Sequence, residues 1–167
     1  MLLRIGVPLT LLAGALALVI LNLANAQTPA SPQAAAPQAY QPSFGDLMTI
    51  AVQPRHTKLG LAGQEKNWTY AAYEFRELQS AFERMARTIP TYRSMNVADL
   101  IDATTKAPME DVAAAIKSGN AAKFAEAYAQ LTATCNACHQ STDHSAVVIQ
   151  VPKVSSYPDQ DFRPPQP

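Results

Sequence analysis

A chain of 167 residues, 48% of them apolar, is long enough to bury the core of one domain. Thirteen basic and thirteen acidic side chains give a formal net charge of zero, which offers no basic surface for a nucleic-acid partner. The only two cysteines lie three positions apart, so a bridge between them would close a very small loop and stabilise little.

Residues 1–26 have the pattern of a secretory signal peptide. Arg4 is the first charged residue, an apolar run covers residues 5–23, and Ala24-Asn25-Ala26 is a small-x-small cleavage site. We therefore expect cleavage after Ala26 and a periplasmic mature protein. The alternative is an uncleaved membrane anchor, and we expect contact with a membrane only in that case.

Residues 27–42 consist largely of Ala, Pro and Gln, which is typical of a disordered or polyproline-like linker. The following 104 residues, 43–146, form the expected domain. Its pattern is mostly helical, so the predicted fold class is all-α.

The first predicted helix covers about residues 44–62, with Ser43 as its N-cap. Met48, Val52 and His56 share one face of this helix. Pro54 lies within it and is expected to kink or split the helix.

The clearest helical pattern runs from Asn67, the predicted N-cap, to about residue 89, where Pro90 follows. Its apolar positions recur every three or four residues: Trp68, Ala71, Ala72, Phe75, Leu78, Phe82, Met85 and Ile89. We predict that this face, Phe75 included, is buried, and that Glu74 and Glu77 lie on the opposite face.

Two shorter helices are predicted next, over residues 97–103 and 108–117. Pro108 suits the first turn of the second helix, and Gly119 suits the position after its end. Asn120 then caps a last helix. One face of that helix carries Phe124, Ala127, Tyr128, Leu131, Cys135 and Cys138.

The last helix contains the run Cys135-Asn136-Ala137-Cys138-His139. This is C-x-x-C-H, the attachment signature of c-type haem. Two thiols one helical turn apart can each add to one vinyl group of the same porphyrin. The next residue, His139, can then bind the iron as the proximal axial ligand. We therefore expect one covalently bound haem c per chain.

A C-x-x-C pair can also be a structural disulfide, a thioredoxin-like redox pair or half of a zinc site. The sequence has no second ligand pair for zinc, and a thioredoxin-like pair follows a strand, whereas the residues before Cys135 have a helical pattern. Covalent haem attachment takes place outside the cytoplasm in bacteria, so the predicted export signal supports the haem interpretation.

Residues 147–167 are expected to form an extended tail over the helices, with at most one short strand. Five prolines prevent a helix there: Pro152, Pro158, Pro164, Pro165 and Pro167.

The block from Asn120 to His139 resembles the class II c-type cytochromes, the cytochrome c-prime group, in which the haem motif lies on the last helix. The resemblance is specific over about twenty residues and looser, in helix order, from Ser43 onward. It implies an up-and-down four-helix bundle with the haem between the first and last helices. It also implies that the sixth iron position is either empty or filled from the first helix, and that the protein can pair as a homodimer.

In such a bundle the first and last helices are antiparallel, so Met48 is expected nearer the iron than His56. Met48 is the first candidate for the sixth ligand, with a core methionine as the alternative. His56 is the second candidate, with a surface or propionate-contacting histidine as the alternative.

The predicted function is therefore electron transfer by a periplasmic monohaem cytochrome, with redox proteins as partners. A five-coordinate haem protein that binds NO or CO is the alternative, and a haem-free thiol protein is a third. We find no nucleophile triad, paired acid–base site or phosphate loop in the sequence, so we do not predict an enzyme.

Overall fold

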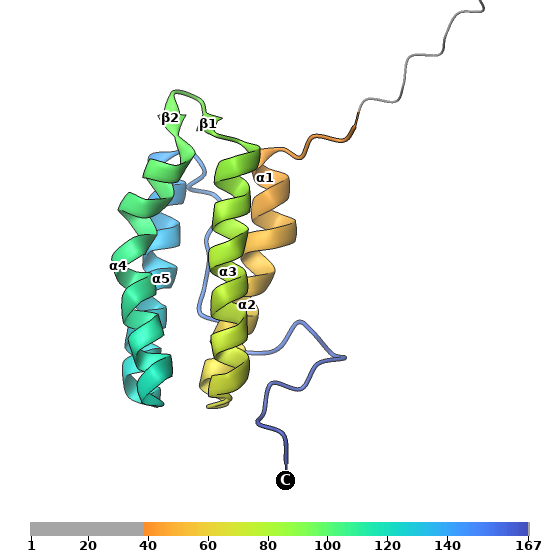
Figure 1. The fold of residues 1–167 in the computed structure, drawn as a ribbon, viewed down its shortest axis with the longest axis vertical. Helices are drawn as coiled ribbons and strands as arrows, with labels where there is room; N and C mark the ends of the chain where they lie inside the picture. The colour runs from red at the N-terminus through yellow and green to blue at the C-terminus, as the bar shows by residue number, and fades with distance from the viewer. Residues whose placement is uncertain (1–38, 167) are drawn as a thin grey trace, which may run out of the picture. The chain divides into compact units, whose positions relative to one another are not determined.

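The computed structural model describes residues 39–166, and these residues are mostly helical with very little sheet (Figure 1). The structure thus confirms the all-α fold class. The predicted signal peptide and most of the predicted linker lie outside the described residues.

The first helical segment consists of α1 (Phe44–Leu47), a π-helical turn η1 (Met48–Val52) and α2 (Gln53–Gln64), which follow one another without a break. Ser43 is the N-cap, as predicted, and its hydroxyl accepts the Asp46 N–H at 3.1 Å. Pro54 was expected to kink or split this helix, and the helix is not split there. In η1 the Gln53 N–H binds the Met48 carbonyl five residues earlier, and the chain changes from this π-helical turn to the α-helix α2 directly before Pro54.

Helix α3 (Trp68–Thr88) begins at Asn67, whose side chain accepts the Tyr70 N–H at 3.1 Å. Leu78, Phe82 and Met85 are buried, which confirms much of the predicted apolar face. Phe75, in contrast, is only half-buried.

Glu74 was predicted on the exposed face of this helix, and the prediction was wrong, because the side chain is 1% exposed. Arg55 on α2 lies 3.2 Å from its carboxylate and also 3.5 Å from Glu77. The ion pair compensates a charge that would otherwise be costly to bury.

A hairpin of two short strands, β1 (Thr91–Tyr92) and β2 (Met95–Asn96), joins α3 to the next helix. This hairpin was not predicted from the sequence. Arg93 in its turn has a φ of 54°, a left-handed conformation for which glycine or asparagine is the usual signal.

The two short helices predicted before Gly119 are one continuous helix, α4 (Val97–Ser118), with Pro108 inside it. The predicted break at Pro108 was therefore wrong. Proline removes the N–H that would bind the Thr104 carbonyl. Packing of α4 against both α3 and the last helix offsets that loss. Gly119 ends the helix with a φ of 62°, as its position predicted.

The last helix, α5 (Ala121–Ser141), packs against α4 and α2, while α3 packs against α2 and α4. The contact between α2 and α5 is close because α2 presents glycines there. A Cβ on Gly60 would collide with the Tyr128 ring, and one on Gly63 would collide with Phe124. After Ser141 the described residues contain no helix or strand, and the chain runs back along the helices (Figure 1).

We predict that Leu78→Ala lowers the free energy of unfolding by about 2–5 kcal/mol, because Leu78 is 1% exposed and its loss leaves a cavity. Phe75→Ala should cost less, since Phe75 is half-buried. Urea unfolding of both variants measures the difference. A loss below about 1 kcal/mol for Leu78→Ala would contradict this assignment of the core.

Candidate functional site

One apolar cavity brings together the residues that the sequence analysis assigned to the haem. Met48, Cys135, Cys138 and His139 all line it. All the helices and the tail after α5 contribute the rest of its wall: Phe44, Thr49, Val52, Gln53, His56, Phe82, Leu100, Ile101, Thr104, Thr105, Thr134, Val147 and Ile149. Its volume is about 110 Å³. Ligand pockets commonly measure about 300–1,000 Å³, so a whole porphyrin requires the surrounding side chains to move apart.

The two cysteines lie in the last third of α5 and are not bonded to each other. Burial, reinforced by the neighbouring Cys138, raises the pKa of the Cys135 thiol to about 11. Burial also raises the pKa of Cys138. Reactive redox pairs have lowered thiol pKa values, often at a helix N-terminus, so this environment does not suit a thioredoxin-like pair.

His139 presents one ring nitrogen to the backbone of the tail. Its Nδ1 lies 2.7 Å from the carbonyl oxygen of Val147, which can only accept a hydrogen bond. Nδ1 therefore donates to this carbonyl, and in the neutral tautomer with the proton on Nδ1 the lone pair that a metal needs lies on Nε2. A ring N–H bound to a backbone carbonyl is the usual arrangement of histidines that bind metals through the other nitrogen.

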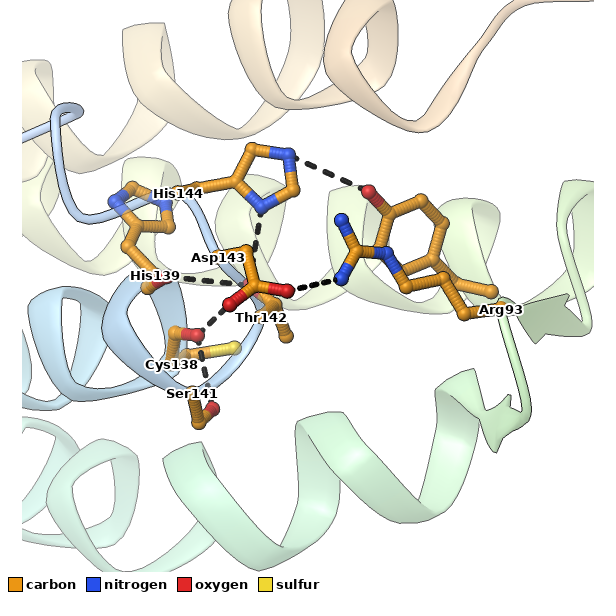
Figure 2. A network of polar contacts seen from close by, with 8 residues as sticks. Arg93, Cys138, His139, Ser141, Thr142, Asp143 and His144 are labelled. Atoms are coloured by element: carbon orange, nitrogen blue, oxygen red, sulfur yellow. Dashed lines mark hydrogen bonds and ion pairs between the residues drawn. The ribbon is translucent and has the colours of Figure 1, made fainter.

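A polar network holds the end of α5 against the hairpin (Figure 2). The Thr142 hydroxyl donates to the Cys138 carbonyl at 2.8 Å, and the same carbonyl accepts the Thr142 N–H at 3.1 Å and the Ser141 hydroxyl at 2.9 Å. Arg93 on the hairpin pairs with Asp143 at 2.6 Å, and the Tyr92 hydroxyl lies 3.3 Å from His144. The hairpin thus positions the end of the helix that carries the haem motif.

The first helix reaches the same end of the molecule. The Phe44 ring stacks on Tyr92 with centroids 4.4 Å apart. Met48 follows one turn later, at the start of η1, and its half-buried side chain faces the cavity. π-Helical turns occur frequently at functional sites, because the extra residue redirects a side chain.

His56 was the second candidate for the sixth ligand, with a surface or propionate-contacting histidine as the alternative, and the structure rules out the surface placement because the side chain is 3% exposed. Its Nδ1 lies 3.1 Å from the Tyr128 hydroxyl and its Nε2 3.0 Å from the Thr132 hydroxyl. Burial lowers the pKa of His56 to about 4, so the ring is neutral at neutral pH. Both ring nitrogens already have polar partners, so His56 is the weaker candidate for an iron ligand.

The contribution of the tail to the site was not predicted from the sequence. Residues 147–163, here called the strap, reach from the cavity to the start of α3. Val147 and Ile149 line the cavity, and Phe162, 5% exposed, stacks on Tyr70. Gln64 and Asn67 donate side-chain hydrogen bonds to strap carbonyls at 2.9 and 3.0 Å. The valines and prolines of the strap form no sequence pattern that predicts contact with the C-x-x-C-H motif.

Within residues 39–166, no group of three or more His, Cys, Asp or Glu side chains is placed to hold a metal ion by itself. Haem iron is held by the porphyrin nitrogens and needs only axial ligands from the protein.

In the same part of the chain, no helix is long and apolar enough to cross a membrane. Comparisons with protein-family models, with curated proteins and with solved structures found no match.

Proposed function

We propose that this chain is an exported monohaem c-type cytochrome that transfers electrons in the periplasm, built as an up-and-down four-helix bundle. The observation that carries the proposal is the cavity shared by both cysteines, His139 and Met48. The helix contacts α2–α3, α3–α4, α4–α5 and α5–α2 support the bundle, because each of these helices packs against two others. The pattern of residues 1–26 supports export.

The residues of the cavity fit a haem c by their chemistry. Cys135 and Cys138 would hold the porphyrin through thioether bonds, and His139 has Nε2 free for the iron. Met48 is the proposed sixth ligand. A haem bound there would supply one-electron chemistry at its iron. The apolar wall would exclude water from most of the ring, and no acid–base pair is required for electron transfer, so we propose a carrier and not an enzyme.

Spectroscopy of the purified mature protein tests the proposal. We expect a Soret band, sharp split bands in the reduced state that indicate six-coordinate iron, and haem colour that persists through denaturing gel electrophoresis. Acidified butanone should leave the haem on the protein. A protein without a Soret band, or one that loses its haem to butanone, would refute the proposal, and broad reduced bands would favour the gas-binding alternative.

A further inference from the structure

We propose that Asn136, inside the C-x-x-C-H motif, is a positioning residue that uses the strap to set the tautomer and basicity of His139. The inference rests on the proposed function, because it concerns the haem ligand. Asn136 occupies a variable position of the motif, where haem attachment itself requires no particular side chain.

Asn136 pairs with both backbone groups of one strap residue. Its amide nitrogen donates to the Ile149 carbonyl at 2.8 Å, and its amide oxygen accepts the Ile149 N–H at 2.7 Å. Only one orientation of the amide satisfies both bonds. The pair therefore fixes the position and register of Ile149 along α5, as a neighbouring strand would do.

This register determines what His139 meets. Val147 precedes Ile149 by two residues, and in an extended chain alternate residues face the same side. The Val147 carbonyl accordingly lies 2.7 Å from His139 Nδ1. Two backbone bonds close the intervening turn: His144 N–H to the His139 carbonyl at 2.7 Å, and Val147 N–H to the His144 carbonyl at 2.8 Å. The acceptor for the His139 ring thus comes from the strap.

A fixed carbonyl acceptor has a chemical effect on the ligand. It holds the proton on Nδ1 and makes Nε2 more basic. A more basic ligand stabilises ferric iron relative to ferrous iron, which lowers the midpoint potential. Loss of such outer contacts typically weakens metal binding about 10–100-fold. A tenfold loss confined to the ferric state raises the potential of a one-electron couple by about 59 mV.

The test compares four variants of the haem-loaded protein with the wild type. Asn136→Ala removes both hydrogen bonds between the Asn136 side chain and the Ile149 backbone. A chain that ends at Ala146 keeps the whole motif but lacks the Val147 carbonyl. Gln64→Ala removes a strap contact far from His139, namely its bond to the Pro152 carbonyl, and Ala137→Ser changes the other variable position of the motif. The readouts are the midpoint potential, the solvent exchange of the His139 Nδ1 proton by NMR, and the exchange of the Ile149 amide proton.

In Asn136→Ala and in the shortened chain we expect the affinity of His139 for ferric iron to fall about tenfold relative to its affinity for ferrous iron. The midpoint potential should therefore rise, and the His139 Nδ1 proton should exchange faster with solvent. The Ile149 amide should exchange faster in Asn136→Ala, and both controls should match the wild type. Unchanged potential and Nδ1 exchange in the shortened chain, with the haem attached, would overturn the inference and leave the proposed function standing. Equal shifts in Gln64→Ala would also overturn it, because any loosening of the strap would then suffice. A wild-type protein without covalent haem would refute the proposed function first, and the tuning role with it.

Discussion

Replacing Cys135 and Cys138 together by alanine is expected to abolish covalent haem retention completely. Both thiols line the cavity and lie one helical turn apart on α5, so each can form one thioether bond to the same porphyrin. Each single variant should keep the haem through the remaining bond. Haem staining of denaturing gels and the intact mass of the protein measure the attachment.

Ala133→Ser is the matched control for this prediction. Ala133 lies on the same helix, is exposed and does not line the cavity, so the variant should retain its haem fully. Haem retained by the double variant through denaturation would show that the cysteines are not the attachment points. A double variant that still binds haem reversibly would agree with the prediction, since His139 remains.

Much of the fold followed from local signals in the sequence. The caps at Ser43, Asn67 and Asn120 and the stop at Gly119 act within one helical turn, so their roles are visible without tertiary contacts. Pro108 shows where local reasoning failed. Its cost to α4 is a local quantity, whereas the packing that offsets it comes from helices distant in the sequence.

The polar residues of the core were the least predictable part. Glu74 and His56 have polar or charged side chains, which favour the surface unless partners are present. Their partners, Arg55 for Glu74 and Tyr128 for His56, lie 19 and 72 positions away. A single sequence offers no means to pair them. The same applies to the strap, whose Ile149 meets Asn136 only after the chain has turned back.

Met48→Ala is expected to make the reduced protein bind carbon monoxide faster, because Met48 lines the same cavity as the two cysteines. A thioether ligand stabilises ferrous iron, raises the potential and occupies the position that a gas would need. We therefore expect the reduced wild type to bind carbon monoxide slowly. In the variant the binding rate should rise more than about tenfold, which corresponds to a competing ligand worth at least about 1.4 kcal/mol. The midpoint potential should fall.

Two matched variants separate ligation from packing in this experiment. Met48→Leu keeps an apolar side chain of similar size but lacks the sulfur, so it should bind carbon monoxide as readily as Met48→Ala. Ile50→Ala changes the same π-helical turn at a residue that is 66% exposed and outside the cavity wall, so it should behave as the wild type.

If the wild type binds carbon monoxide fast and has a five-coordinate spectrum, the function is gas binding and not electron transfer. If the wild type and Met48→Ala both resist carbon monoxide, the sixth ligand is not Met48. His56 is then the next residue to replace, and its ring must give up the Thr132 or the Tyr128 contact to reach the iron.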